Sequence, residues 1–351
     1  MRLERITPGT RPPADLEGAV LTRDLTIAGG RWSKGRRLSA ADLRAIEHAP
    51  AGRPVTVLVA GPGEVHEDDA GRRLALLVTG GDPAGAGLDA RGPSESRVNL
   101  HATVAGVVEI RVPLVERLNR LDPVEVFTVF DGQVVAPGDL VASVKVGPHL
   151  VDEAVLVAAE RLAPTGRAVV RVAAFRRVRL AVLVKEHITG SARERFEASV
   201  RAKAAGLGVT LTSIDYVRDD AGDVAAAMGD LTRGDHRADI VLTAGGASTD
   251  PGDAFYLAVG TLGGRIVRHG VPSHPGSMLW LGRVGRTSIV GLPSCGAFSK
   301  ATAADLLLPR LVAGQPATAA TVAKLGHGGI LTRSQRFRFP AYARDLDAPD
   351  G

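Results

Sequence analysis

The sequence is poor in residues that mark several specialised classes of protein. Its 351 residues include one cysteine, Cys295, so no disulfide can form within the chain. Such scarcity is usual for proteins of a reducing cytosol. Aromatic residues make up only 4% of the chain, and no long run of lysine and arginine accompanies them. Both shortages argue against a surface that stacks on bases and neutralises the phosphates of nucleic acid.

Long apolar segments are also missing. No apolar run reaches the roughly 18 to 20 residues needed to cross a bilayer. The N-terminal segment MRLERITPGTRPP lacks the hydrophobic stretch of a signal peptide. We therefore expect a cytoplasmic protein with neither a membrane segment nor a nucleic-acid partner. Its net charge of +5 instead favours small anionic ligands.

The length of the chain predicts more than one domain. We expect residues 1–95 to form a small α+β unit that ends in a glycine-rich linker. The pattern over 96–175 predicts a β-rich module and a bridging helix. We expect residues 176–313 to form an α/β domain and residues 314–351 to form a polar tail.

Three local signals stand out in the N-terminal half. Ser39 is placed to cap a short helix through Asp42. The acidic residues between Glu64 and Asp69 predict an exposed loop. The glycines and prolines of 80–96 predict a linker or mobile loop, although such glycines can also hold phosphate.

From Arg176 on, short apolar runs alternate with helical patterns. Strands are expected at 178–184, 209–214, 239–242, 265–268 and 288–291. Ser191 and Glu194 match a capping box at the start of the first helix. This alternation predicts an α/β fold: a three-layer α/β/α domain with a mostly parallel sheet, preceded by smaller β-rich modules.

A glycine-rich turn follows the strand at 239–242. Gly245 and Gly246 can face backbone N–H groups toward an anion at the carboxyl end of the sheet. Asp250 and Asp253 follow, and their carboxylates can either bind Mg²⁺ or cap the next helix. Two more turns, at 275–277 and 291–296, come soon after. Together the three turns predict a pocket for a phosphorylated ligand.

Four segments here resemble a known family. They are VRDD at 217–220, DIVLTAGGAS at 239–248, LGG at 262–264 with PG at 275–276, and GLP at 291–293. Their order and spacing resemble the molybdenum-cofactor biosynthesis domain, which molybdopterin adenylyltransferases and molybdopterin molybdenumtransferases share. A segment at 34–43 also resembles the N-terminal region of the molybdenumtransferases. The GLPSCG and LLPR segments resemble a shorter branch of molybdopterin-binding proteins.

The resemblance implies a ligand and a set of site residues. The ligand is molybdopterin or the molybdenum cofactor, with Mg²⁺ at Asp250 and Asp253. Asp253 corresponds to a catalytic aspartate of the family. Glu194 corresponds to a position where the family has a carboxylate, but a helix-capping role accounts for this residue equally well. The implied cofactor-binding residues are Gly245, Gly246, Ala247, Ser248, Thr249, Pro275, Gly276, Ser277, Pro293, Ser294, Cys295 and Lys300. The implied partners are a molybdoenzyme or cofactor-maturation protein and, by analogy, a second copy of the chain.

The sequence also departs from the family pattern. Where the family has an acidic turn after the first strand, this chain has Lys185, Glu186 and His187, and the lysine that usually follows the 275–276 turn is missing. Lys185, His187 or His274 can replace the lost charge. Cys295 can be a small buried residue or a thiol that faces the pocket.

These departures leave three functions open. One is binding of molybdopterin or its molybdenum cofactor for maturation or delivery. The alternative is an active molybdenumtransferase that inserts molybdate into adenylylated molybdopterin and releases AMP. A nucleotide hydrolase built on the same domain is the third, and no partner hydrolase domain accompanies it here.

Overall fold

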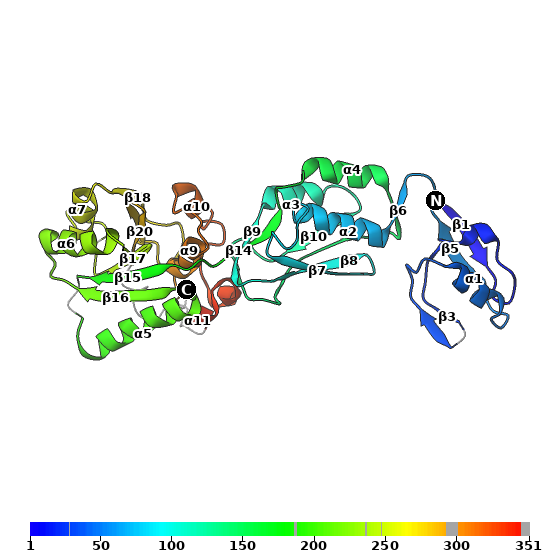
Figure 1. Ribbon diagram of the computed structural model, residues 1–351, viewed down its shortest axis with the longest axis horizontal. Coiled ribbons are helices and arrows are strands. Elements are labelled where there is room, and N and C mark those ends of the chain that lie inside the picture. The colour runs from blue at the N-terminus through cyan, green and yellow to red at the C-terminus, as the bar shows by residue number, and fades with distance from the viewer. Residues whose placement is uncertain (28, 186–187, 236, 247, 293–300, 345–351) are drawn as a thin grey trace. The chain divides into compact units, whose positions relative to one another are not determined.

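The computed structural model describes the chain except residues 28, 186–187, 236, 247, 293–300 and 345–351 (Figure 1). The chain divides into two compact units. Unit 1 comprises Met1–Val104, Val108–Asp131 and Ala136–Val172, and unit 2 comprises Ala105–Val107, Gly132–Val135 and Ala173–Gly351. In the described part of the chain, no helix is both long and apolar enough to span a membrane.

Unit 1 begins with a small three-stranded antiparallel sheet. Its strands are β1 (Arg2–Ile6), β5 (Val55–Val59) and β2 (Val20–Leu21), in that order. A hairpin of β3 (Leu25–Ile27) and β4 (Gly30–Trp32) and the helix α1 (Ala40–Glu47) complete this part. The predicted cap is confirmed, because the Ser39 hydroxyl accepts from the Asp42 N–H and the Asp42 carboxylate accepts from the Ser39 N–H.

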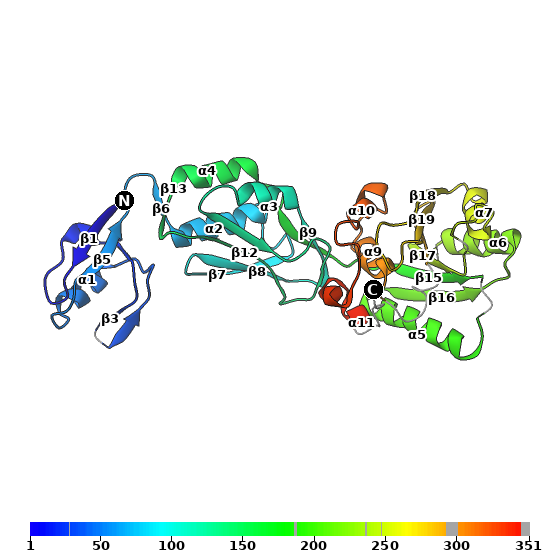
Figure 2. The same ribbon diagram turned by 180° about the vertical axis from the view of Figure 1, so that it is seen from behind.

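The rest of unit 1 is a four-stranded antiparallel sheet with helices against it. The strand order is β10 (Val124–Thr128), β12 (Leu140–Val146), β8 (Arg97–Ala102) and β7 (Leu88–Ser94). Helix α2 (Glu67–Val78) packs on β12, β8 and β7, and α4 (Glu153–Leu162) packs on α2 (Figure 2). The remaining elements up to Ala174 are α3 (Val112–Leu118), β6 (Glu64–His66), β13 (Leu150–Asp152), β9 (Gly106–Ile110), β11 (Val134–Val135) and β14 (Val170–Ala174). Of these, β11 belongs to unit 2, and β9 and β14 have residues in both units.

Two local predictions in this unit were wrong. The acidic segment is not an exposed loop, because it forms β6 and the start of α2. Glu67 is buried, and its Oε1 lies 2.7 Å from Nδ1 of His149. The glycine-rich segment contains β7, which pairs with β8. The partner of Glu67 is distant in the sequence, whereas β7 pairs with the strand that directly follows it, and local composition reveals neither contact.

Unit 2 is built on a six-stranded sheet. Its order is β16 (Thr210–Tyr216), β15 (Arg179–Val184), β17 (Ile240–Ala244), β20 (Thr287–Gly291), β19 (Trp280–Val284) and β18 (Arg265–His269). The first four strands are parallel, and β19 and β18 are antiparallel to their neighbours. The predicted mostly parallel sheet is therefore confirmed, although β19 was not expected.

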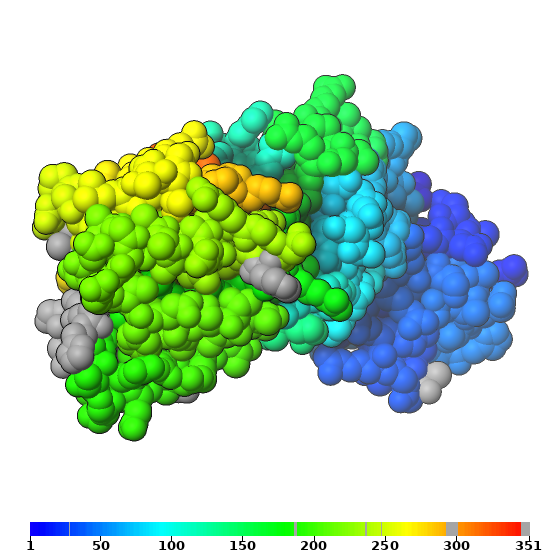
Figure 3. All heavy atoms as spheres, turned by 60° about the vertical axis from the view of Figure 1, so that its left-hand side comes forward, coloured from blue at the N-terminus to red at the C-terminus, as the bar shows by residue number. Residues whose placement is uncertain are grey.

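Helices cover both faces of this sheet, which completes the three layers. Helices α5 (Gly190–Gly206) and α9 (Ala303–Val312) pack on one face, and α6 (Ala221–Thr232) and α7 (Ala254–Thr261) on the other. The side chains of α6 and α7 lie beside each other in the space-filling view (Figure 3). Strands buried on both faces read as continuous apolar runs, as in the segment IVL of β17.

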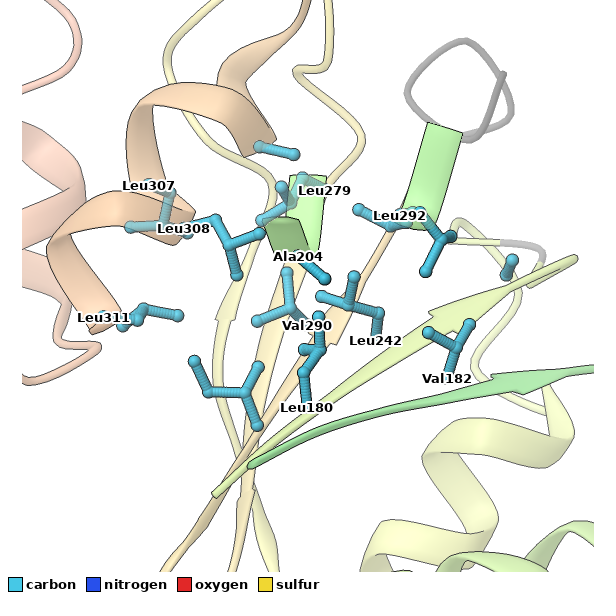
Figure 4. Packing of buried hydrophobic residues seen from close by; sticks show 14 of the residues in the cluster. Leu180, Val182, Ala204, Leu242, Leu279, Val290, Leu292, Leu307, Leu308 and Leu311 are labelled. Carbon is cyan, nitrogen blue, oxygen red and sulfur yellow. The ribbon is translucent and has the colours of Figure 1, made fainter. Parts of the chain in front are cut away.

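Alternate residues of the central strands point to opposite faces of the sheet and belong to two different hydrophobic cores. Leu180, Leu242 and Val290 face the α9 leucines (Figure 4). Ala181 and Val241, their neighbours in sequence, belong to the opposite core. Each fully buried leucine contributes about 1.5–3 kcal/mol. These two cores fix the sheet edge at which the strands end.

The C-terminal segment packs on this domain rather than extending from it. It contains α10 (Ala319–Ala323), the 3₁₀ helix η2 (Arg333–Arg338) and α11 (Ala341–Arg344). Leu331 and Phe339 are buried in a small core with Leu306 of α9. Tyr342 of α11 lies against α5, where its ring centroid is 5.4 Å from the Lys203 ammonium.

Candidate functional site

A buried lysine marks the carboxyl end of β15. Lys185 directly follows the strand, and its N–H donates to the Ala244 carbonyl at the end of β17, at 3.2 Å. Its side chain is only 4% exposed. The ammonium lies 2.8 Å from Oδ1 of Asp219 and 2.9 Å from Oδ2 of Asp253. One cation thus joins two carboxylates that come from different loops.

The two carboxylates keep this lysine charged. Burial acts to lower the pKa of Lys185, but the hydrogen bonds to Asp219 and Asp253 outweigh it, and the pKa is raised above its usual value. The ring of Phe255 adds a weaker attraction, since its centroid is 5.4 Å from the ammonium. The lysine is therefore a fixed positive charge at neutral pH.

Asp253 caps a helix, which is one of the two roles that the sequence left open, and it also contacts Lys185. Its Oδ1 accepts from the Phe255 N–H at 2.9 Å, so it caps α7. Its Oδ2 contacts the Lys185 ammonium, so it also belongs to the charged cluster. The side chain is 3% exposed. A cap alone contributes about 1 kcal/mol, and the contact with lysine places this cap within the site.

The glycine-rich turn lies over the start of α7. Gly245 has φ of +88°, a left-handed conformation that favours glycine. A Cβ on Gly246 would come within 3.2 Å of Cδ2 of Phe255 and 3.7 Å of Oδ2 of Asp253. The Tyr256 hydroxyl donates to the Ser248 carbonyl at 2.9 Å. The turn is thus held against α7 and brought next to the Lys185 cluster.

The second predicted turn lies at the same edge of the sheet. In the strand register, Thr243 of β17 pairs with Gly291 of β20, and Gly291 pairs with Trp280 of β19. Residues 275–279 lead into Trp280 and therefore lie at the carboxyl end of the parallel strands. The Pro275 carbonyl accepts from the Ala303 N–H at 2.9 Å, which places this turn against the N-terminus of α9.

Gly276 explains why this second turn is tight. Its φ is +103°, and a Cβ there would come within 2.9 Å of the Ala303 nitrogen. Ser277 is half-buried, and its carbonyl accepts from the Val271 N–H at 2.9 Å. The exposed His274 is held by the C-terminal segment, since its N–H donates to the Gly329 carbonyl at 2.7 Å.

The predicted metal ligands do not fit Mg²⁺ as they stand. Asp250 is exposed, and its Oδ1 accepts from the Gly252 N–H at 2.8 Å. Oδ2 of Asp253 already contacts an ammonium ion. Among the described residues, no group of three or more His, Cys, Asp or Glu side chains is placed to hold a metal. The cation that these loops do contain is Lys185.

Glu194 lies apart from this cluster in its contacts. It is exposed in α5, just beyond the first turn, and the N-cap of this helix is Thr189. The predicted capping box is wrong, because the helix begins at Gly190 and the Ser191 hydroxyl accepts from Nη1 of Arg195 at 3.2 Å. No hydrogen bond found among the described residues links Glu194 to Lys185. Its predicted catalytic role stays a prediction.

Several predicted residues lie outside the part of the chain that the structure describes. They are Ala247, Pro293, Ser294, Cys295, Lys300 and His187. Thr249 is described and is exposed. The roles proposed for all of these residues stay predictions.

Two residues of the site were not singled out from the sequence. Asp219 and Asp220 were named only as part of the VRDD segment, and the structure shows that Asp220 caps α6 and Asp219 pairs with Lys185. Nothing in the local sequence indicated a role for Tyr256, because its hydrogen bond to Ser248 depends on how α7 packs. A pair of aspartates after a strand was the available clue, since a helix needs only one cap.

A family model matches the part of the chain that contains this cluster. Residues 176–313 match a family described as "probable molybdopterin binding domain". No curated protein sequence matches the chain. This domain therefore belongs to the molybdenum-cofactor biosynthesis family.

Three solved structures are similar to parts of the chain. The molybdopterin biosynthesis MoeA protein of Pyrococcus horikoshii is 16% identical, with 70% of this chain and 79% of that chain covered and a TM-score of 0.32. A molybdenum cofactor biosynthesis protein B is 18% identical, and the match covers 44% of this chain and 99% of that chain with a TM-score of 0.29. The molybdopterin biosynthesis enzyme MoaB of Thermus thermophilus is 21% identical. The match covers 40% of this chain and 98% of that chain, and its TM-score is also 0.29. These scores are too low to add weight, and the assignment rests on the family match.

Proposed function

Since residues 176–313 form a domain of the molybdenum-cofactor biosynthesis family, we propose that the protein binds molybdopterin or the molybdenum cofactor. The binding site is the sheet edge where β15, β17 and β20 end. Its ligand is an anionic pterin, held through its phosphate. The protein serves cofactor biosynthesis, maturation or delivery.

The charged cluster beside the glycine-rich turn is the observation that carries this proposal. Lys185 is buried there with Asp253, and Gly246 passes over the same carboxylate. A buried ion pair is costly unless it is well satisfied, so its presence at a loop-lined sheet edge favours a functional role. Ligands of open α/β sheets bind at such carboxyl edges.

Helix termini add to the suitability of this edge for a phosphate. Helices α7 and α9 both begin at it, at Ala254 and Ala303. The N-terminus of a helix carries a partial positive charge and unpaired N–H groups. The turns at Gly245 and Gly276 bring backbone, without side chains, close to these two termini. This arrangement suits the phosphate of a pterin.

Binding fits these residues better than metal-assisted transfer of molybdenum. A transferase that uses Mg²⁺ needs carboxylates free to coordinate the ion. Asp219 and Asp253 instead contact an ammonium ion. We therefore place binding first and keep the molybdenumtransferase as the alternative.

One experiment separates the two functions. The purified chain is incubated anaerobically with adenylylated molybdopterin and molybdate, and bound pterin and released AMP are measured. We expect bound pterin and no AMP above the protein-free control. AMP release that depends on the protein would establish the alternative, and absence of bound pterin would overturn both.

Paired glycine variants locate the site within α7 and its turn. Gly246→Val drives a side chain into Phe255 and Asp253, so we expect at least a tenfold loss of pterin affinity. Gly260→Ala is the matched control, because a Cβ at Gly260 has no atom within 4 Å. Equal affinities for the two variants would place the ligand elsewhere.

The proposed partners follow from the same function. A carrier of the cofactor passes it to a molybdoenzyme or to a cofactor-maturation protein. We expect transfer of bound pterin to an apo-molybdoenzyme to be faster than transfer from free pterin. The chain is also proposed to form a homodimer, which light scattering after size-exclusion chromatography would test.

A further inference from the structure

The Lys185 ammonium does at this site what a divalent cation does in other phosphate sites. It bridges carboxylates of two separate loops, at 2.8 Å to Asp219 and 2.9 Å to Asp253. Resting on the function proposed above, we propose that Lys185 replaces Mg²⁺, so that the protein binds its anionic pterin ligand without any divalent metal.

The charges of the cluster favour this exchange. One ammonium and two carboxylates carry a net charge of −1, which is close to balance. A Mg²⁺ ion on the same carboxylates would lie near the ammonium. At an effective dielectric constant near 20, two unit charges 4 Å apart interact by about 4 kcal/mol, and the double charge of Mg²⁺ increases that repulsion. The ammonium therefore disfavours a Mg²⁺ ion on the carboxylates that it already contacts.

The surroundings also suit an ammonium ion better than Mg²⁺. The Phe255 ring lies on one side of Lys185, and Asp253 gives its other oxygen to the backbone of α7. Mg²⁺ requires six near-octahedral oxygen ligands and usually retains several waters. An ammonium ion has three donors. Asp219 and Asp253 accept from two of them, and the third serves the ligand phosphate.

The neighbouring carboxylates are committed to other contacts. Asp220 accepts from the N–H groups of Gly222 and Asp223, and Asp223 contacts Arg218 at 2.7 Å. Asp250 accepts from the Gly252 N–H. One oxygen of each of these three carboxylates is thus already engaged, in a helix cap, an arginine pair or a turn.

The first arm of the test uses the unaltered protein. Molybdopterin affinity is measured anaerobically in EDTA and in 5 mM Mg²⁺, by quenching of protein or pterin fluorescence. We expect the two dissociation constants to agree within twofold. Binding more than tenfold tighter in Mg²⁺ would overturn the inference and leave the proposed function standing. Absence of binding in both buffers would overturn both.

The second arm needs no pterin and uses Mn²⁺ alone. Mn²⁺ binding is followed by electron paramagnetic resonance. We expect no bound Mn²⁺ on the unaltered protein and a new site on Lys185→Ala, because Asp219 and Asp253 are then released. Adding Asp219→Asn to that variant should remove the new site. Lys324→Ala, at an exposed lysine, is the matched control and should bind no Mn²⁺.

The remaining outcomes of the second arm are equally decisive. Tight Mn²⁺ binding to the unaltered protein that Asp219→Asn abolishes would overturn the inference. So would a folded Lys185→Ala variant that binds no Mn²⁺. If circular dichroism shows that Lys185→Ala does not fold, Lys185→Met takes its place, and the first arm decides the inference on the unaltered chain.

Discussion

Among the described residues of unit 2 are two buried lysines, and they differ in what surrounds their carboxylates. Lys203 contacts Asp305, and the side chains are 3% and 0% exposed. Lys185 contacts Asp253 and also Asp219, whose side chain is 62% exposed. The first pair lies inside the packing of α5, α9 and α11. The second lies at the sheet edge, with one carboxylate in solvent.

The difference separates a structural ion pair from the cluster that we propose for ligand binding. Lys203 and Asp305 fix α9 to α5, and Tyr342 packs on the same ammonium. Asp305 also caps α9 through the Thr302 N–H at 2.9 Å. In the described part of the chain, no solvent-facing partner belongs to that pair, whereas a ligand can approach the Asp219 side of Lys185. Burial alone therefore does not identify a binding site.

The largest expected effect comes from breaking the structural pair. Lys203→Met leaves Asp305 charged and buried, which costs about 3–5 kcal/mol of the free energy of unfolding. Urea denaturation monitored by circular dichroism measures it. The double variant Lys203→Met with Asp305→Asn should recover part of the loss, since no unpaired charge remains. A loss below about 1 kcal/mol would show that the pair is not structural.

The pH dependence of the free energy of unfolding at alkaline pH tests the same region. Burial and the nearby Asp305 carboxylate raise the pKa of Tyr342 well above its usual value. The unfolded chain therefore loses this proton above about pH 10 while the folded chain keeps it, so stability falls as pH rises through that range. The slope is about 1.4 kcal/mol per pH unit for one group. Tyr342→Phe should reduce the slope by that amount, and an unchanged slope would contradict the assignment.

A smaller effect is expected at the glycine-rich turn. Tyr256→Phe removes the hydrogen bond to the Ser248 carbonyl, which costs about 1 kcal/mol. Because the turn loses its anchor, pterin affinity should fall severalfold. Tyr216→Phe, which removes a hydroxyl contact to Glu197 at 3.3 Å, is the control for loss of a tyrosine hydroxyl. Similar affinities for both variants would mean that Tyr256 does not position the turn.

The smallest change in stability is expected for Asp219→Asn. The side chain is mostly in solvent, and exposed ion pairs contribute about 0–1 kcal/mol. Thermal unfolding should therefore change little, in contrast to Lys203→Met. A loss of several kcal/mol would place Asp219 in the structural class and remove the contrast between the two lysines.

Local patterns in the sequence were enough for much of unit 2. The apolar runs of β15, β17 and β20 and the turn at Gly245 were predicted from periodicity and glycine placement. Asp253 was predicted as a cap or a site residue; it caps α7, and its part in a site stays a prediction. These features depend on a few adjacent residues, so one sequence suffices to find them.

Features that depend on strand pairing and burial were missed, and one helix cap was misplaced. Trp280–Val284 was not predicted as β19, because its place next to β20 decides that it is a strand. The start of α2 was assigned to an acidic loop, because its charged residues conceal a buried Glu67. The α5 cap was placed two residues too late, since Ser191 and Thr189 are both acceptable caps by composition.

The sequence by itself determined which family this domain belongs to and where its turns lie, because glycines and apolar runs act locally. Only the tertiary structure decided the charge of the site. Lys185 and Asp219 are 34 residues apart, and their pairing requires β15 and β16 to lie side by side. Electrostatic energy depends on distance and burial, which no local pattern specifies. Lys185, Asp219 and Asp253 therefore came together only when the strands were assembled.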